Sequence, residues 1–425
     1  MTTAVGPTSF NHMPLKRLFG LVNGGTPPAD EMYWGGGVIW VTPADLASMD
    51  GCSISVSGRT LTTEGLTAGS RHVPKGSIVI STRAPIGYVV LAAEDLSTNQ
   101  GCRALVPRSG VSSRFFQYVL LVARPSLQAF GNGTTFMEIS GSALGSLVVP
   151  VPPLQEQRRV VAFLDAETAR IDELIEEQRR LVGLIEEHRF VAASAVLGSH
   201  VGGEAGNLTT ALSGVPNSWK VTPLRFIADI QSGITLGKRY QGELEERPYL
   251  RVANVLDGTV DLNEVTTIEV PQDVAQRHEL RFGDVLMTEG GDNDKLGRGT
   301  VWEEQVPSCL HQNHVFAVRP RSEVLMPRFL AAVMGSAWGR AYFTATAHQT
   351  TNLASTNRSK LGRFLIPLPS VEEQDRLLAE LNYLFDRLDD MANAARDQVA
   401  LLREHRQALI TMAVTGGLEA VGRTA

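Results

Sequence analysis

Residues 150–157 read PVPPLQEQ, and a related stretch, IPLPSVEEQ, returns at residues 366–374. Gln157 and Gln374 end the two stretches and are 217 residues apart (374 − 157). Prolines suit the start of a helix, where the N–H that proline lacks would have no partner within the helix. Each stretch leads into apolar residues spaced alternately by four and three, which is the pattern of an amphipathic helix with coiled-coil character. The chain therefore predicts two long helices that begin alike.

The apolar stripes of the two helices match position for position at the same offset of 217 residues. One helix cannot bury such a stripe alone, so we expect the two stripes to pack together as an antiparallel coiled coil. His188 and His405 fall at one equivalent position, where packed polar residues fix the register of paired helices. The predicted helix–helix interface comprises Leu164, Ile171, Leu174, Leu181, Ile185, His188, Leu381, Leu388, Met391, Leu402, His405 and Leu409.

The sequence in front of each long helix also repeats. Short apolar and β-branched runs, broken by Gly, Pro, Ser and Thr, predict a β-rich domain. RFGDVLMT at residues 281–288 parallels PKGSIVIST at residues 74–82, and each domain is expected to contain one further helix, at residues 113–130 and 328–344. We therefore expect an α+β protein with two pseudo-symmetric β-rich domains separated by the two long helices. The predicted segments are a tail at residues 1–13, a β-rich domain at 14–150, a helical region at 151–198, a linker at 199–212, a second β-rich domain at 213–367, a second helical region at 368–415 and a tail at 416–425.

The composition of the 425 residues is that of an ordinary globular protein, with 43% hydrophobic and 20% charged residues. The net charge of −6 and the pI of about 5.9 argue weakly against a nucleic-acid partner, but a global sum does not exclude a local basic face. Cys52, Cys102 and Cys309 are far apart, which fits neither a disulfide framework nor a metal site and favours the cytoplasm. No apolar run is long enough to cross a membrane, and the first residues lack a secretion signal pattern.

The sequence contains no recognisable catalytic motif. It lacks the GxxxxGK[ST] phosphate loop, HExxH and GxSxG, and the FxGxG and NPPY or DPPY motifs of methyltransferases. His311 and His314 have no plausible metal partners nearby, so core or surface roles are favoured over metal binding. Asp284 and Glu289 suggest a nuclease pair, but Ser77 replaces Asp284 in the repeat, so a shared catalytic role is not expected. We predict no catalytic residue, no metal site and no cofactor bound by this chain.

Polar loops remain as the most informative chemistry. Three pairs of loops occupy equivalent positions in the two domains, namely residues 81–85 with 288–291, 98–103 with 310–314, and 132–135 with 349–352. Any one of them is most simply a solvated turn, but Asn, Gln and Arg side chains also form paired hydrogen bonds with base edges. The candidate DNA-binding residues are Arg83, Asn99, Gln100, Arg103, Asn132, Thr134, Thr135, Asn293, Lys295, Arg298, Gln312, Asn313, Gln349, Thr350, Thr351, Asn352, Asn357, Arg358 and Lys360.

The chain resembles the specificity (S) subunits of type I restriction–modification systems. The resemblance rests on the two proline-marked stretches with their long helices and on the domain openings GGTP at residues 24–27 and SGITLG at residues 232–237. It covers essentially the whole chain and implies two target-recognition domains, at residues 14–150 and 213–367, which each read one half of a bipartite sequence in double-stranded DNA. The two domains differ strongly from each other in sequence, so the resemblance implies no particular base preference.

The same resemblance implies partners. The paired helices would set the gap between the half-sites and dock two methyltransferase (M) subunits, and motor-nuclease (R) subunits would complete a restriction complex. S-adenosylmethionine, ATP and Mg²⁺ would be used by those partners, and this chain would be a non-catalytic subunit of a DNA adenine methyltransferase and ATP-dependent endonuclease.

Two other classes of protein stay open on the sequence alone. A coiled-coil scaffold that binds no DNA is favoured by the acidic composition. An enzyme with a cryptic nuclease or methyltransferase activity is the third hypothesis. A salt-dependent gel shift with a co-expressed methyltransferase separates the scaffold from the DNA-binding subunit, and incubation of the isolated chain with DNA and S-adenosylmethionine tests for the enzyme.

Overall fold

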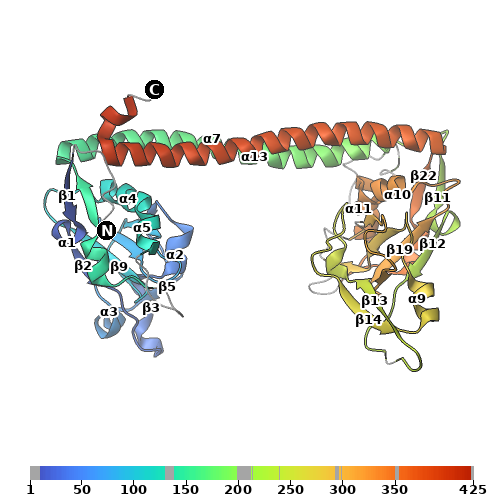
Figure 1. Cartoon of the computed structure of the whole chain (residues 1–425), viewed down its shortest axis with the longest axis horizontal. Helices are drawn as coiled ribbons and strands as arrows, with labels where there is room; N and C mark the ends of the chain where they lie inside the picture. Colours follow the sequence, from blue (N-terminus) through green and yellow to red (C-terminus); the bar gives the residue numbers. More distant parts are fainter. Residues whose placement is uncertain are drawn as a thin grey trace. The chain divides into compact units, whose positions relative to one another are not determined.

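The computed structural model describes residues 10–129, 138–198, 212, 214–238, 240–291, 296–297, 299–349 and 354–422 (Figure 1). The chain divides into two compact units. Unit 1 comprises residues 1–178 and 397–425, and unit 2 comprises residues 179–396. Each unit therefore contains one β-rich domain and a segment of both long helices, α7 (Leu154–Val196) and α13 (Val371–Gly422).

Unit 1 contains two main sheets. The larger has the strand order β2-β9-β6-β7-β4 and the smaller has the order β5-β3-β8. A separate antiparallel pair, β1 with β10, leads directly into α7. The strands are β1 (Asn11–Pro14), β2 (Phe19–Asn23), β3 (Trp34–Val41), β4 (Ser53–Ile54), β5 (Arg59–Leu61), β6 (Ile78–Ser81), β7 (Val89–Ala92), β8 (Leu96–Thr98), β9 (Cys102–Pro107) and β10 (Val148–Val151). The shorter helices are α1 (Leu15–Leu18), η1 (Glu31–Tyr33), α2 (Pro43–Ser48), α3 (Thr63–Gly69), α4 (Ser113–Val122), α5 (Arg124–Ala129) and α6 (Gly141–Ser146).

Unit 2 contains sheets of order β12-β19-β15-β17 and β14-β13-β18, and a small sheet of order β16-β21-β20. The antiparallel pair β11 with β22 leads into α13. The strands are β11 (Lys220–Pro223), β12 (Ala228–Ser232), β13 (Glu245–Leu250), β14 (Thr266–Val270), β15 (Val285–Thr288), β16 (Gly290–Gly291), β17 (Gly299–Val301), β18 (Leu310–His311), β19 (Val315–Pro320), β20 (His348–Gln349), β21 (Ala354–Ser355) and β22 (Leu365–Leu368). The shorter helices are η2 (Leu224–Phe226), η3 (Val252–Asn254), α9 (Gln272–His278), α10 (Pro327–Gly335), α11 (Ala337–Thr346) and α12 (Arg358–Arg363).

The two units share one topology. The pairing β12-β19-β15-β17 repeats β2-β9-β6-β7, and the parallel pair β13–β18 repeats β3–β8. In each unit the first strand pairs with the strand that enters the long helix, as β1–β10 or β11–β22. The predicted α+β fold with two pseudo-symmetric β-rich domains and two long helices is therefore confirmed.

Each hydrophobic core includes the long helices. In unit 1, Phe115 and Phe116 of α4 are fully buried in one cluster with Leu164 of α7 and Ala413 of α13. In unit 2, the corresponding cluster contains Leu381 of α13. Full burial of one large apolar side chain stabilises a protein by about 1.5–3 kcal/mol, so each β-rich domain and its helix segments are expected to fold together.

The pairing of α7 with α13 is antiparallel. In unit 2, Arg396 lies 3.6 Å from Glu186 and Arg189 pairs with Asp389, so residue numbers rise along one helix as they fall along the other. In unit 1, the Arg406 guanidinium lies 2.9 Å from the Asp172 carboxylate.

The predicted helix interface needs a correction. Leu164, Ile171, Ile185, Leu381 and Leu409 are buried, and Leu388 and Leu402 are half-buried. The prediction is wrong for Leu174, Leu181, His188, Met391 and His405, which are all exposed; Leu174 is 45%, Leu181 37% and Met391 50% exposed.

Adjacent apolar pairs explain this error. Leu174 is followed by Ile175 and Met391 by Ala392, so two alternations of threes and fours fit the sequence equally well. The structure buries the second member of each pair, Ile175 at 6% and Ala392 at 3% exposure. A small residue such as alanine lets helix axes approach closely, whereas methionine at that position would hold them apart.

Three helix bounds also differ from the prediction. The helix expected at residues 113–130 is broken after Val122, because Pro125 has no N–H to continue the hydrogen-bond ladder. The helix expected at 328–344 is likewise two helices, and Ser336 is the N-cap of the second. Helix α13 continues to Gly422, where a tail was expected from residue 416.

Candidate nucleic-acid interface

Gln157 joins α7 to the β-rich domain of unit 1. Its side chain is buried, its Oε1 accepts a hydrogen bond from the Ser112 N–H at 2.9 Å, and its Nε2 donates to the Pro152 carbonyl oxygen at 2.8 Å. Ser112 is the N-cap of α4. The start of the long helix is therefore fixed to the start of the main helix of the domain.

Gln374 makes the same connection in unit 2. Its Oε1 accepts from the N–H of Met326, the N-cap of α10, at 2.9 Å. Its Nε2 donates to the carbonyl oxygens of Val324 at 2.8 Å and Pro369 at 3.0 Å. Neither glutamine was predicted to be functional, although both end the repeated proline-marked stretch.

Three loops meet in unit 1 and form what we call the first loop cluster, residues 81–85, 98–103 and 138–140. The Thr82 N–H donates to the Gly101 carbonyl oxygen at 2.8 Å, and the Ile139 N–H donates to the Thr82 carbonyl oxygen at 2.9 Å. Arg83 Nε donates to a Glu138 carboxylate oxygen at 3.0 Å. Backbone hydrogen bonds thus bring together three loops that are distant in sequence.

The second loop cluster, residues 288–291, 310–314 and 354–357 of unit 2, is built in the same way. The Glu289 N–H donates to the His314 carbonyl oxygen, and the Thr356 N–H donates to the Glu289 carbonyl oxygen, both at 2.8 Å. His314 Nδ1 lies 2.6 Å from the Glu289 carboxylate at the exposed side of the cluster. The two clusters are therefore equivalent in backbone construction and different in side chains.

The domain openings GGTP and SGITLG pack against these clusters. A Cβ at Gly24 would lie 1.7 Å from the Asn99 carbonyl oxygen, and a Cβ at Gly233 would lie 1.9 Å from that of His311. The Gly25 N–H donates to the Thr98 carbonyl oxygen at 2.8 Å. Only glycine permits so close an approach of two backbones, which explains why both openings contain it.

Two of the candidate DNA-binding asparagines also support the backbone through their side-chain oxygens. The Asn99 Oδ1 accepts from the Gly101 N–H at 2.9 Å, and the Asn357 Oδ1 accepts from the Lys360 N–H at 3.0 Å as the N-cap of α12. Ser140 caps α6 at the equivalent position of unit 1. The cap residue before α6 and α12 therefore recurs for a structural reason.

The other described candidates lie at or near the two clusters. Gln100 contacts the Thr26 hydroxyl, and Arg103 donates to Asn23 at the end of β2, a residue that sequence reasoning missed. Gln312 and Asn313 are half-buried, Arg358 is exposed and Lys360 is half-buried. Nine candidates and the side chain of Gln349 lie outside the described residues; the nine are Asn132, Thr134, Thr135, Asn293, Lys295, Arg298, Thr350, Thr351 and Asn352.

Asp284 has a structural role. It is fully buried, and its carboxylate receives two hydrogen bonds from Arg319 at 2.7 Å each. A fork-to-fork pair of this kind stabilises a buried charge and leaves the carboxylate no free face for catalysis. Within the residues that the structure describes, no group of three His, Cys, Asp or Glu side chains could hold a metal ion.

His311 is a core residue of unit 2 that makes stability depend on pH. Its Nδ1 lies 2.7 Å from the Val315 carbonyl oxygen, and burial lowers its pKa to about 4. His278 and Arg319 also lower this pKa, whereas the bond to Val315 and the Asp284 charge raise it.

We expect unit 2 to lose up to about 3 kcal/mol of stability as pH falls from about 6.5 to about 4. In that window the unfolded histidine binds a proton and the buried, folded His311 does not. Urea unfolding of the wild type and of His311→Asn across this range measures the difference. Equal loss in both proteins would mean that another group causes the pH dependence.

Comparison with known proteins assigns this arrangement to a class. Residues 7–182 match the family model described as the type I restriction modification DNA specificity domain. The fold of the chain is that of specificity subunits. A structure from a study of complex assembly and conformational transition of the type I R-M system aligns over 97% of this chain and 100% of that chain, with a TM-score of 0.70 and 19% identity. The HsdS subunit of Thermoanaerobacter tengcongensis aligns over 98% of this chain and 99% of that chain, with a TM-score of 0.54 and 20% identity.

Individual relatives carry the same description. The type I restriction enzyme MjaIX specificity subunit of Methanocaldococcus jannaschii is 31% identical over 258 residues, which cover 56% of this chain. The aligned part spans 56% of the length of that relative. The EcoBI specificity subunit of Escherichia coli is 23% identical over 371 residues, which cover 83% of this chain and 77% of that protein.

Proposed function

We propose that this chain is the DNA-binding specificity subunit of a type I restriction–modification complex, and that each unit reads one half of a bipartite target. The observation that carries the proposal is the equivalence of the two loop clusters, which share a backbone and differ in side chains. Equivalent scaffolds with different polar side chains suit the reading of two different sequences, because base edges are distinguished by hydrogen-bonding side chains and not by the scaffold.

The long helices act as the spacer in this proposal. Each of α7 and α13 contributes to the core of both units. In this proposal, a longer helix pair therefore increases the distance between the two DNA-reading domains. Gln157 and Gln374 lock each reading domain to its helix. The gap between half-sites is then a property of the helices, and the bases of each half-site are a property of one domain.

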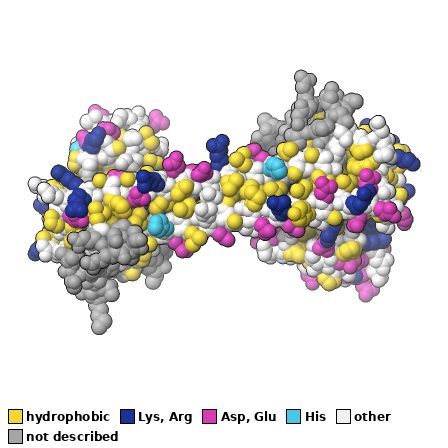
Figure 2. Space-filling model, turned by 90° about the horizontal axis from the view of Figure 1, so that it is seen from above, with side chains coloured by type: hydrophobic (Ala, Val, Ile, Leu, Met, Phe, Trp, Pro, Cys, Tyr) yellow, Lys and Arg dark blue, Asp and Glu magenta, His cyan; other side chains and the backbone are white. Residues whose placement is uncertain are grey.

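The exposed face of the helices is a candidate docking surface for methyltransferase subunits. Hydrophobic side chains are exposed along the helices (Figure 2). Of the residues in α7 and α13, Leu174, Leu184, Met391 and Leu401 are each at least 45% exposed. Exposed apolar residues at this density favour a protein partner. Restriction subunits would join through the methyltransferase, and S-adenosylmethionine, ATP and Mg²⁺ would serve those partners. The described helices include none long and apolar enough to cross a membrane, and we expect the complex to act in the cytoplasm.

Exchange of residues 14–150 for the first domain of another specificity subunit should change one half-site and leave the other unchanged. The reason is that the two loop clusters are built within separate units. Methylome sequencing of cells that express the exchanged chain with its methyltransferase measures both halves and the spacer. A change in both half-sites would refute modular reading, and exchange of residues 213–367 is the matched control for the other half.

A coiled-coil scaffold that binds no DNA is the second candidate, because the net charge is −6. If this chain is only a scaffold, the co-expressed methyltransferase should shift DNA in a gel equally well with and without it. Omission of this chain from the mixture decides between the two functions. We expect sequence-selective binding only when both proteins are present.

A further inference from the structure

Three arginines that have no ion-pair partner among the described residues line one pocket of unit 2. Arg225 comes from η2, and Arg358 and Arg363 come from the two ends of α12. The pocket has a volume of about 380 Å³, and Asp229 is its one acidic lining residue. Its lining residues therefore sum to a charge of about +2, whereas other arginines of the unit, such as Arg319 and Arg328, are paired with carboxylates.

The equivalent face of unit 1 shows that the fold does not require these arginines. A Cβ added to Gly362 of α12 would lie 3.4 Å from the Cβ of Arg225. A Cβ added to Gly145 of α6 would lie at the same distance from the Cβ of Lys16. The helix α6 is thus placed like α12. Gly141 and Ser146 stand where α12 has Arg358 and Arg363.

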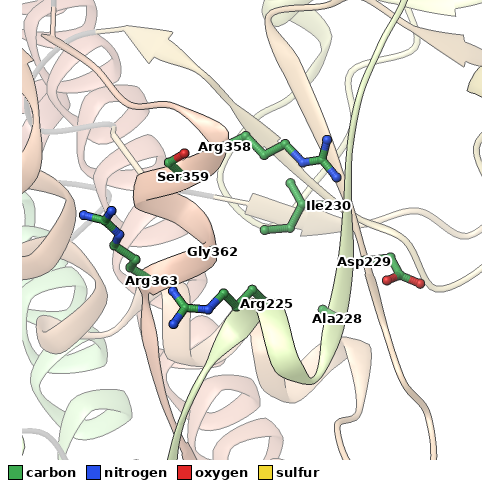
Figure 3. A pocket seen from close by; sticks show the side chains of 8 residues that line it. All are labelled: Arg225, Ala228, Asp229, Ile230, Arg358, Ser359, Gly362 and Arg363. Atoms are coloured by element: carbon green, nitrogen blue, oxygen red, sulfur yellow. The ribbon is translucent and has the colours of Figure 1, made fainter.

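Three arginines at one exposed pocket favour an anion as the bound group. In unit 1, Lys16 stands at the position of Arg225, and the Arg103 guanidinium lies beside Gly141, where an added Cβ would be 2.7 Å from Arg103 Nη1. The guanidinium groups in Figure 3 point in different directions and do not converge on one point. This spread fits successive phosphates of a chain better than a single small anion, and guanidinium groups are well matched to phosphate oxygens.

The place of the pocket in unit 2 connects it to the reading loops. Helix α12 follows residues 354–357, which belong to the second loop cluster through the bond from Thr356 to Glu289. DNA bound at that cluster would therefore present its backbone close to α12.

We propose that Arg225, Arg358 and Arg363 hold backbone phosphates of the DNA at the half-site read by unit 2, and that helix α6 of unit 1 lacks the two contacts that α12 makes. The inference rests on the proposed DNA-binding function and adds an asymmetry to it. The pocket supplies affinity without sequence information, since phosphates are the same at every base pair. These three contacts therefore contribute to the salt dependence of binding at half-site 2.

The test uses the full chain co-expressed with its methyltransferase, and a duplex that carries the target found by methylome sequencing. The dissociation constant is measured between about 50 and 200 mM salt for the wild type and for the triple variant Arg225→Gln, Arg358→Gln, Arg363→Gln. Each lost phosphate contact lowers the slope of log affinity against log salt by about 0.9, so we expect a decrease of about 2 to 3. The methylated sequence should not change.

Two matched controls locate the effect. Lys16→Gln, at the equivalent position of unit 1, should lower the slope by at most about 1. A duplex with uncharged methylphosphonates only at half-site 2 should weaken wild-type binding and have little further effect on the triple variant. Glutamine keeps the hydrogen-bonding character of these exposed positions, and thermal unfolding checks that the variant is folded.

Three results would overturn the proposal. They are an unchanged salt slope, a changed methylated sequence, and loss of methyltransferase co-purification in the absence of DNA, which would make the pocket a protein-docking site. A wild-type complex without target preference would instead refute the proposed function itself, so the two failures are distinguishable.

Discussion

The variants Gln157→Ala and Gln374→Ala should each destabilise the junction between a reading domain and its long helix by about 2–4 kcal/mol. Each removes a buried side chain that holds both an N–H and a carbonyl oxygen of the backbone. A buried polar group left without a partner costs about 1–3 kcal/mol, and the vacated space adds to that loss.

Hydrogen exchange at the Ser112 amide reports the change in unit 1 directly. Its N–H has Gln157 as its acceptor, so the amide should exchange at least about 30-fold faster in Gln157→Ala, as about 2 kcal/mol implies. In unit 2, the Met326 amide should respond in the same way to Gln374→Ala.

Two further variants separate hydrogen bonding from packing and from helix propensity. Gln157→Met keeps the volume and removes the hydrogen bonds, so it should also expose the Ser112 amide. Gln155→Ala changes an exposed glutamine in the same turn and should alter stability by no more than about 0.5 kcal/mol. Unchanged exchange at Ser112 in Gln157→Ala would show that other contacts fix the junction.

The effect on function should be specific to one half-site. A loosened junction at Gln157 leaves the loop cluster of unit 1 intact, since its bonds from Thr82 and Ile139 do not involve the helix. We therefore expect methylation at targets with altered spacers and weaker preference for one gap length, with the half-site bases preserved.

The repeat allowed the architecture to be predicted from the sequence. The apolar pattern of the long helices, however, fits two helical phases, so the buried residues of the helix interface could not all be predicted. The offset between Gln157 and Gln374 was enough to predict two equivalent units, because a repeated sequence must fold twice in the same way. The same pattern did not determine which of Leu174 and Ile175 is buried, since neighbouring apolar residues fit two helical phases. Only the approach of the partner helix selects one.

The reading loops show a similar limit. Polar loop residues look alike in a sequence whether they bind bases or support the backbone, as Asn99 and Asn357 illustrate. The contact that joins Thr82, Gly101 and Ile139 spans distant segments and leaves no local signal. Arg225 and Arg363 were missed for the same reason, because their shared pocket arises only when η2 packs on α12.

Lengthening both helices by seven residues should lengthen the spacer of the recognised sequence and preserve both half-sites. Duplication of residues 172–178 after Gln178 and of residues 390–396 after Arg396 places the additions at the boundary between the units in each helix. A heptad keeps the phase of the buried stripe to within about 20°. At about 1.5 Å per residue the helices grow by about 10 Å, which corresponds to about three base pairs at 3.4 Å each.

Paired insertion matters because the two helices are joined across their length. Insertion into α7 alone would shift Asp172 or Glu186 relative to its arginine partner in α13 and should abolish methylation. Methylome sequencing of cells that carry the doubly extended chain gives the spacer and both half-sites in one measurement. A constant spacer with altered half-site bases would refute the role of the helices, because the inserted heptads touch neither loop cluster. A spacer longer by about three base pairs would instead show that the domains determine the bases and the helices determine the spacing. Gln157 and Gln374 connect each domain to its helix.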